Sequence, residues 1–414
     1  MNTPRVTNQI RILKMKATDE YIIPAPELRS EMSLRLGRVA EAMNESGMDA
    51  MLIATNANLY YAAGMMYRGY VYLTREGRVV YFVIRPTEVR HEENVVEIRK
   101  PEMIPGELGR LGIAPASTIG LELDVQSYSE IERLKKVFSD ASVMNASPLL
   151  RICRQVKTQY EIGQMKEDGR HHVAVYRKIQ RLYRRDMTDV EFQIAIEHEL
   201  RNEGSLGFLR VAGQLMEINL GSVIAGNNAD APGPYDFAMG GAGVSPALPC
   251  GACGEIMRVG ETVMVDVNGC FNGYQTDMTR VWSLGEPSPL ALRAHECSRR
   301  ILRSLEQMGR PGVEVAELYR RAEAIVAEEG LQSYFMGHRQ HAPFIGHGVG
   351  IELNETPPVT GRSRELLKEN MTLALEPKFV IPGTGAVGVE NTYVVRTDGL
   401  ENITPFDEEL QNLF

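Results

Sequence analysis

The chain has 414 residues, a length that predicts two domains rather than a single core. Hydrophobic residues make up 43% and charged residues 24% of the chain, as is usual for a globular protein in water. The formal net charge is −9 and no block of lysine and arginine stands out, which argues against nucleic acid as a partner. No apolar run reaches the roughly 18 residues that cross a bilayer, and residues 1–27 lack the apolar core of a signal peptide, so we expect no membrane partner and a cytoplasmic location.

The first part of the chain, residues 1–152, is predicted to be an α/β domain. Apolar side chains recur at helical spacing over residues 34–43, and Gly47 then ends this helix. A further helix is expected to begin near Ser127 or Ser129. Strands are predicted over residues 50–54, 70–73, 79–84 and 117–122. This alternation predicts a sheet with helices packed on it.

The second part, residues 153–414, is predicted to be an α+β domain, with helices and strands in separate blocks. Its boundary with the first part is expected near residues 148–156. Thr188 and Glu191 form a capping box, which satisfies the free N–H groups at the start of a helix. Helices are predicted over residues 158–183, 188–204, 289–308 and 313–329, and strands in the glycine-rich segments 221–284 and 340–414.

One acidic residue lies in each of two neighbouring apolar strands. Asp266 and Asp277 are separated by a turn that Gly269 and Gly273 bracket. A hairpin of these strands would bring the two carboxylates side by side. Carboxylates that are so close repel each other unless a cation lies between them, and a divalent metal ion would meet that need.

The last part of the chain repeats this pattern with Glu376 and Glu390. They lie in apolar strands on either side of a turn at residues 382–385. A buried acid in an apolar strand is costly unless it is paired or bound to a metal ion. Between the two predicted hairpins, His347 is flanked by glycines, which allow the backbone and a ligand to approach each other closely.

A metal site is the preferred interpretation of these residues. Four carboxylates and one imidazole suit Mn²⁺, Co²⁺, Fe²⁺ or Zn²⁺ better than a structural zinc bound by thiolates. They are enough for two divalent ions bridged by carboxylates, which could activate a water molecule. The alternative is that they are ordinary ion pairs and a core histidine, which explains each residue taken alone but not two matched hairpins. The predicted metal ligands are Asp266, Asp277, His347, Glu376 and Glu390.

The order Asp, Asp, His, Glu, Glu resembles that of the pita-bread metallopeptidases, a family that includes methionine aminopeptidase, aminopeptidase P, prolidase and creatinase. The resemblance covers residues 155–410 and implies a pita-bread catalytic domain and a homodimer. Residues 1–152 resemble the N-terminal domain of creatinase and prolidase. The strings that match are Gly273-Tyr274, Asp277-Met278-Thr279-Arg280, Gly346-His347-Gly348-Val349-Gly350, Glu376-Pro377 and Val389-Glu390-Asn391-Thr392.

The resemblance also implies a role for each ligand. Asp266 would bind one ion, and His347 and Glu376 would bind the other. Asp277 and Glu390 would bridge the pair. Glu376 would also accept the proton of the attacking water. The implied activity is the hydrolysis of Xaa-Pro dipeptides or of peptide N-termini.

Two histidines of the Xaa-Pro peptidases are absent from this chain. In those enzymes they help to hold the substrate and to stabilise the tetrahedral intermediate, and here Gly233 and Asn354 stand in their places. The amide of Asn354 could still donate a hydrogen bond. The catalytic candidates are Glu376, His341 and Asn354. The substrate-binding candidates are His338, Arg280 and Gly233, with a ligand carboxylate as the alternative partner of Arg280.

These two departures keep other functions open. A non-peptidase enzyme on the same scaffold could hydrolyse a C–N bond of a small metabolite, although creatinase, which does so, lacks the full ligand set. A metal-assisted lyase, in which a base near the ligands abstracts a proton, is a second kind of non-peptidase enzyme that this scaffold could support. A binding protein without catalytic activity is the least favoured, because such proteins usually lose the metal ligands and all five are present here.

Overall fold

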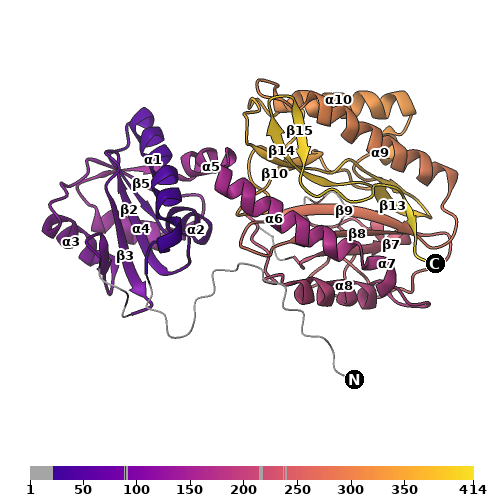
Figure 1. The fold of residues 1–414 in the computed structure, drawn as a ribbon, viewed down its shortest axis with the longest axis horizontal. Coiled ribbons are helices and arrows are strands. Elements are labelled where there is room, and N and C mark those ends of the chain that lie inside the picture. Colours follow the sequence, from indigo (N-terminus) through magenta and orange to yellow (C-terminus); the bar gives the residue numbers. More distant parts are fainter. Residues whose placement is uncertain (1–21, 88, 90–91, 214–217, 236, 238–239) are drawn as a thin grey trace. The chain divides into compact units, whose positions relative to one another are not determined.

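The computed structural model describes residues 22–414 except 88, 90–91, 214–217, 236 and 238–239 (Figure 1). The segment 1–21, which carries most of the region considered for a signal peptide, lies outside the described residues. The chain divides into an N-terminal unit that ends at Arg154 and a C-terminal unit that begins at Gln155. In the described part of the chain, no helix combines the length and the apolar character that a membrane span requires.

The N-terminal unit is built on one mixed sheet. Its strand order is β4-β3-β2-β1-β5-β6. The pairs β1–β2 and β2–β3 are antiparallel, whereas β3–β4, β1–β5 and β5–β6 are parallel. The strands are β1 Ala50–Ile53, β2 Arg68–Thr74, β3 Val79–Arg85, β4 Val95–Glu97, β5 Thr118–Leu121 and β6 Ser142–Asn145.

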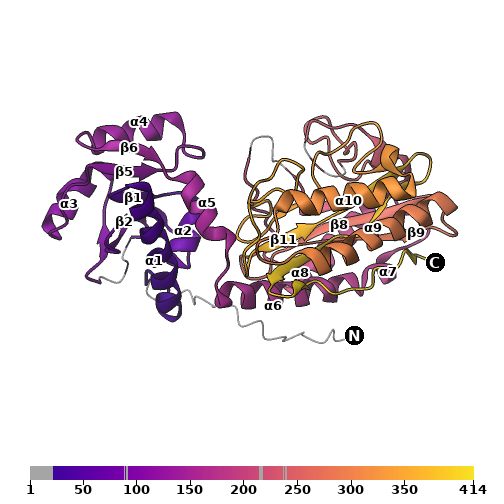
Figure 2. The ribbon, with the colours of Figure 1, turned by 90° about the horizontal axis from the view of Figure 1, so that it is seen from above.

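Helices cover both faces of this sheet, and Figure 2 shows α1 and α4 on opposite sides of it. The first helix ends as predicted at Gly47, whose φ of 74° is in the left-handed region that glycine adopts readily. Ser127 caps α4 as predicted by accepting from the backbone N–H of Glu130. The helices are η1 Pro26–Leu28, α1 Arg29–Ser46, α2 Asn56–Ala63, η2 Pro101–Met103, α3 Ile104–Arg110, α4 Tyr128–Val137 and, across the boundary, α5 Ser147–Gln155.

The helices of the C-terminal unit follow the prediction with one difference. Thr188 and Glu191 form the predicted capping box of α8, and Gly204 ends that helix in a left-handed conformation. The helix expected over residues 158–183 is instead two helices, with a break between them at residues 177–178. The helices are α6 Gln159–Tyr176, α7 Ile179–Leu182, α8 Asp189–Glu203, η3 Gly226–Asp230, α9 Pro289–Met308, α10 Val315–Glu329 and η4 Gln332–Tyr334.

The strands of the C-terminal unit lie between two pairs of helices (Figure 1). One four-stranded sheet has the order β16-β9-β8-β7, another has the order β10-β11-β14-β15, and β12 pairs with β13 alone. The strands are β7 Gly221–Ala225, β8 Thr262–Gly269, β9 Thr276–Ser283, β10 Gly346–Gly348, β11 Thr372–Leu375, β12 Lys378–Ile381, β13 Gly385–Gly388, β14 Asn391–Arg396, β15 Gly399–Asn402 and β16 Gln411–Asn412.

Each pair of helices closes a separate core against these strands. Apolar side chains of α6 and α8 pack with those of β7, β8 and β9, around the fully buried Tyr176, Phe192 and Trp282. Side chains of α9 and α10 pack with those of β11 to β14, around Leu305, Phe379 and Tyr393. The strands are therefore held from both sides, and the acidic residues that they carry have fixed backbone positions.

Candidate metal centre

The predicted hairpin of β8 and β9 is present, and it places the two aspartates diagonally. Asp266 lies opposite Thr279, and Asp277 lies opposite Asn268. The expectation that the aspartates face each other directly is therefore wrong by two residues, because the turn at residues 270–275 sets a different register. Diagonal neighbours on one face of a sheet are still within reach of each other.

The second pair of acids lies where the strands are interrupted. Glu376 lies between β11 and β12, and Glu390 lies between β13 and β14. The prediction of one continuous hairpin is wrong here, because β11 pairs with β14 whereas β12 and β13 form a sheet of their own. Pro377 has no N–H to donate to a ladder, which favours the break directly after Glu376. Both glutamates thus lie at the point where the chain changes sheet.

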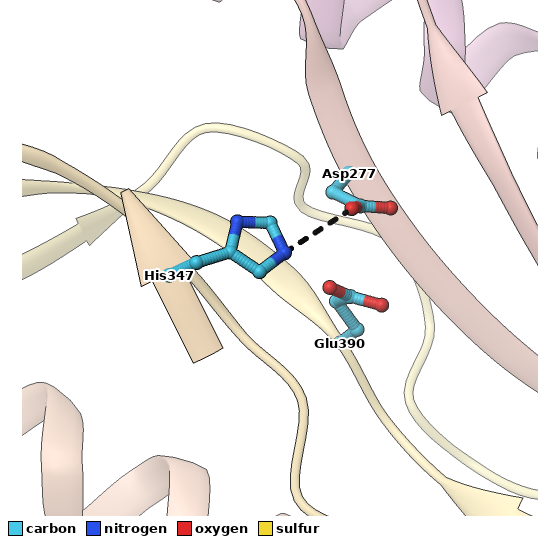
Figure 3. A group of neighbouring side chains, drawn as sticks. All are labelled: Asp277, His347 and Glu390. Atoms are coloured by element: carbon cyan, nitrogen blue, oxygen red, sulfur yellow. Dashed lines mark ion pairs between the residues drawn. The ribbon is translucent and has the colours of Figure 1, made fainter. Parts of the chain in front are cut away.

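His347 in β10 directs one ring nitrogen toward the carboxylates of Asp277 and Glu390 (Figure 3). Its Nδ1 donates to the carbonyl of Gly348 at 3.0 Å, which fixes the ring. Its Nε2 then lies 3.8 Å from Asp277 Oδ2 and 3.7 Å from Glu376 Oε1. An imidazole held in this way offers Nε2 as a metal ligand.

The ligand atoms fall into two groups that share Glu390. Asp277, His347 and Glu390 form the first group, and Asp266, Glu376 and Glu390 form the second, with the ligand atoms of each within 4.8 Å of one another. In the first group, Asp277 Oδ1 and Glu390 Oε1 are buried without a hydrogen-bond partner among the described residues. Burial and then neighbouring carboxylates raise the pKa of Asp277 well above its ordinary value. A cation would remove this cost, so the first group fits a divalent metal ion.

The second group already has a cation, Lys378, which sequence analysis did not identify. Its side chain is fully buried, and its Nζ donates to Asp266 Oδ2 at 2.8 Å, Glu376 Oε2 at 2.7 Å and Glu390 Oε2 at 3.0 Å. Burial alone would lower the pKa of Lys378, but the three carboxylates outweigh it and hold that pKa well above the ordinary value. The sequence signal that could have identified Lys378 is its spacing from Glu376, because residues two apart in an extended segment share a face.

Arg280 holds the backbone at Glu390 and does not line the cavity of the acids. Its guanidinium is 1% exposed and donates to the carbonyls of Thr279 and Glu390, each at 2.8 Å, and to Asn391 Oδ1 at 2.8 Å. Thr279 Oγ1 also donates to Glu390 Oε2 at 2.7 Å. The candidate role of Arg280 as a substrate contact is therefore corrected to that of a positioning residue.

Asn354 lies beside the acids but is engaged in hydrogen bonds. Its Oδ1 accepts from the backbone N–H of Ala212 at 2.8 Å, and its Nδ2 donates to the Ala212 carbonyl at 2.8 Å. The amide thus connects the loop after His347 to the segment around Ala212. Asn354 lines the same cavity as the metal ligands, so its place as a catalytic candidate stays a prediction.

The other three candidates lie away from the acids. His341 is exposed and its Nδ1 donates to the Phe335 carbonyl at 2.8 Å. His338 lies 2.9 Å from Asp230 Oδ2, and with Gly233 it lines a small pocket of about 30 Å³. None of the three lines the cavity of the metal ligands. The expectation that His341 or His338 supplies the missing imidazole is therefore corrected: their loop hydrogen-bonds with residues 230–233 instead.

Four of the five candidate ligands open into one cavity of about 550 Å³, a size suited to a small molecule. Asp266, Asp277, His347 and Glu376 line it. Among its described lining residues, His347 is the one histidine, and there is no lysine or arginine. Its apolar wall is formed by Val211, Ile218, Tyr235, Phe237, Phe344 and Leu353.

This chain is similar to known proteins over most of its length. An Xaa-Pro dipeptidase of Pyrococcus horikoshii is 26% identical over 92% of this chain and 99% of its own length. Among solved structures, an Xaa-Pro dipeptidase from Bacillus anthracis has a TM-score of 0.75 at 22% identity, covering 92% of this chain and 99% of its own. An X-Pro aminopeptidase from Thermotoga maritima has a TM-score of 0.73 at 22% identity, covering 91% and 99%. At these identities the solved structures show the fold alone.

Family models match both parts of the chain. Residues 35–156 match the creatinase/prolidase N-terminal domain, and residues 163–397 match metallopeptidase family M24. The predicted fold class, the predicted resemblance and the predicted class of enzyme, a metallopeptidase-like hydrolase, are thereby confirmed. The family also implies that the enzyme uses divalent metal, for which the acids and His347 are the candidate ligands. The chain belongs to metallopeptidase family M24.

Proposed function

We propose that this enzyme is a metal-dependent hydrolase that cleaves Xaa-Pro dipeptides or the N-termini of peptides whose second residue is proline. The observation that carries the proposal is the convergence of four carboxylates and His347 at one place, where Asp266, Asp277, Glu376 and His347 line a single cavity. The names of the similar proteins, Xaa-Pro dipeptidase and X-Pro aminopeptidase, support the substrate class. The resemblance further supports a homodimer, and the ligand chemistry supports Mn²⁺, Co²⁺, Fe²⁺ or Zn²⁺.

The residues of the first group would hold the metal, namely Asp277, His347 and Glu390. A divalent ion bound there would lower the pKa of a water molecule and polarise the scissile carbonyl. Glu376 is the candidate proton acceptor. Its Oε2 accepts from Lys378, whereas its Oε1 faces His347 Nε2 at 3.7 Å and is in position to take the proton of the attacking water.

The cavity wall favours an apolar substrate. Phe237, Phe344 and Leu353 can pack against a proline ring and an apolar side chain before it. Because no lysine or arginine is among the described lining residues, the carboxylate of a dipeptide has no cationic partner there. Peptides that continue beyond proline would avoid this desolvation cost.

The test is a cleavage assay with metal-stripped protein to which Mn²⁺ or Co²⁺ is added. The substrates are Xaa-Pro dipeptides, their C-terminal amides and Xaa-Pro-Xaa peptides, with Xaa-Ala peptides as the matched set. We expect cleavage that requires metal and proline. Asp277→Asn should abolish metal binding and cleavage, whereas Glu369→Gln, at an exposed acid of the same unit, should keep both. Metal binding without cleavage of any peptide would contradict the proposed substrate class.

A second candidate function is favoured by the lining of the cavity. With His347 as the one histidine among the described lining residues and Asn354 hydrogen-bonded to Ala212, the usual donors to a tetrahedral intermediate are missing. Of the two alternatives, a metal-assisted lyase forms no tetrahedral intermediate and would not need these donors, whereas the hydrolysis of a C–N bond of a small metabolite would take its donor from another group. A protein that binds metal, spares the whole peptide panel and releases product from a library of small amides or β-substituted acids would support this candidate.

A further inference from the structure

Lys378 stands in one of the two cation positions of the centre. We propose that the enzyme binds a single divalent ion, at Asp277, His347 and Glu390, and that the ammonium of Lys378 replaces the second ion. The inference rests on the proposed function only in requiring that the first position bind a metal. It departs from the expectation of two ions that the ligand count alone suggests.

The contacts of the ammonium are those of a bound cation. The three carboxylates that receive its hydrogen bonds, Asp266, Glu376 and Glu390, are the same three residues that form the second group of ligands. Its three N–H donors match three acceptor oxygens at 2.7 to 3.0 Å. Each of the three carboxylates of the second group thus already has one oxygen bound to a cation.

A second ion could not share this position with the ammonium. A divalent ion approaches a carboxylate oxygen to about 2.0–2.2 Å, well inside the distances of the lysine hydrogen bonds. An ion on the oxygens of Asp266 and Glu390 would therefore take the space of Lys378 Nζ. The two cations would also repel each other at very short range in a buried site. Binding a second ion requires that the lysine leave.

The backbone around Lys378 is arranged to keep the side chain in place. The register of β12 and β13 pairs Lys378 with Gly388. A Cβ at Gly388 would lie 2.9 Å from Lys378 Cα and 3.2 Å from its Cγ, so the absence of a side chain there leaves room for the lysine. The carbonyl of Lys378 also accepts from the N–H of Met336 at 2.8 Å. The side chain is 0% exposed, so an alternative position in solvent would require it to leave a closed environment.

The charges of the centre balance with one ion. Four carboxylates and one ammonium leave three net negative charges, which one divalent ion reduces to one. Two divalent ions together with Lys378 would instead leave a net positive charge. Of the two carboxylate oxygens without a hydrogen-bond partner among the described residues, Asp277 Oδ1 belongs to the first group alone, and Glu390 Oε1 belongs to the residue that both groups share.

The experiment counts the ions in the full-length protein. Metal-stripped protein is titrated with Mn²⁺, bound metal is measured by mass spectrometry after desalting, and the electron paramagnetic resonance spectrum reports whether two ions are spin-coupled. We expect one ion per chain and no coupled spectrum. Lys378→Gly, which removes the ammonium and leaves space, should bind two ions and give the coupled spectrum. Lys157→Met removes the other buried lysine of this unit and should still bind one ion.

Each outcome separates the two proposals. Two ions with a coupled spectrum in the unchanged protein would overturn the role of Lys378 and leave the proposed function intact. One ion in both the unchanged protein and Lys378→Gly would also overturn that role, provided that circular dichroism shows the variant to be folded. No bound Mn²⁺, Co²⁺, Fe²⁺ or Zn²⁺ at any concentration would overturn the proposed function itself. If the Lys378→Gly variant does not fold, the number of bound ions is measured for Lys378→Ala instead.

Discussion

Two lysines are buried among the described residues of the C-terminal unit, and they differ in how many carboxylates they face. Lys157 donates to one, Glu355 Oε2, at 2.8 Å, and the other oxygen of Glu355 accepts from the backbone of Ile351. Lys378 faces three carboxylates and leaves two oxygens of the centre without a partner. A one-to-one pair is complete in itself, whereas an excess of carboxylates indicates that a further cation belongs there.

Replacing each lysine with methionine tests most directly whether the two buried lysines differ in this way. Both variants leave a carboxylate buried without its cation, which costs about 3–5 kcal/mol of unfolding free energy. We expect Mn²⁺ to stabilise Lys378→Met by more than it stabilises the unchanged protein, because a further ion can take the place of the ammonium, whereas Lys157→Met should gain only as much as the unchanged protein. Urea denaturation with and without Mn²⁺ measures this. An equal gain in both variants would contradict the distinction.

A third buried cluster sharpens the comparison because burial shifts both of its titratable groups towards their neutral forms. Thr276 Oγ1 lies 2.8 Å from Asp168 Oδ2 and 3.0 Å from His172 Nδ1. Burial lowers the pKa of His172 to about 3 and raises that of Asp168 to about 7. Both shifts favour the neutral forms, so this site meets the cost of burial without a counterion.

The neutral His172 predicts a dependence of stability on pH. Since its folded pKa is below the unfolded value of about 6.5, its contribution is present above pH 6.5 and is lost as the pH falls towards 3. Between pH 6.5 and 5 this amounts to about 2 kcal/mol. Asp168 acts in the opposite direction, so the test is the difference between the unchanged protein and His172→Gln in denaturation at both pH values. Parallel curves would show that His172 is not the titrating group.

The smallest effect is expected at Asn354, whose two hydrogen bonds to Ala212 involve neutral groups. Asn354→Ala should lower the unfolding free energy by about 1–2 kcal/mol. Asn354→Asp keeps the acceptor but sets a carboxylate oxygen against the Ala212 carbonyl, so it should lose at least as much. If Asn354 only positions the loop, KM for peptides should change more than kcat. A loss confined to kcat would instead identify its amide as a donor to the reacting carbonyl.

The candidate metal ligands could be singled out from the sequence because each is an acid in an apolar segment or a histidine among glycines, which are local patterns. Lys378 was not identified as part of the site, because a lysine in a strand is ordinarily at the surface. Recognising it required the break at Pro377, which makes β12 a separate strand, and its pairing with Gly388. The register of Asp266 and Asp277 was predicted wrongly for a similar reason, because it depends on the turn between the two strands and not on the sequence of either strand.

Helices of ten or more residues with clear end signals were predicted well, and shorter ones were not. The eight residues of α2 and the nine of α5 have too few turns to show a period. His338 and His341 were misplaced because their proximity to the acids was inferred from closeness along the chain. Their loop instead meets residues 230–233 through the Asp230 carboxylate and the Gln340 side chain.

Glu390 is shared by both groups of candidate ligands: its Oε2 accepts from Lys378 and Thr279, whereas its Oε1 has no hydrogen-bond partner among the described residues. This sharing makes the two positions thermodynamically linked. A hydrogen bond from the Lys378 ammonium lowers the electron density that the Glu390 carboxylate can offer to a divalent ion. By reciprocity, an ion that binds this carboxylate more strongly would weaken its hydrogen bond with Lys378. The hydroxyl of Thr279 can therefore tune metal affinity and ion exchange without itself touching the metal.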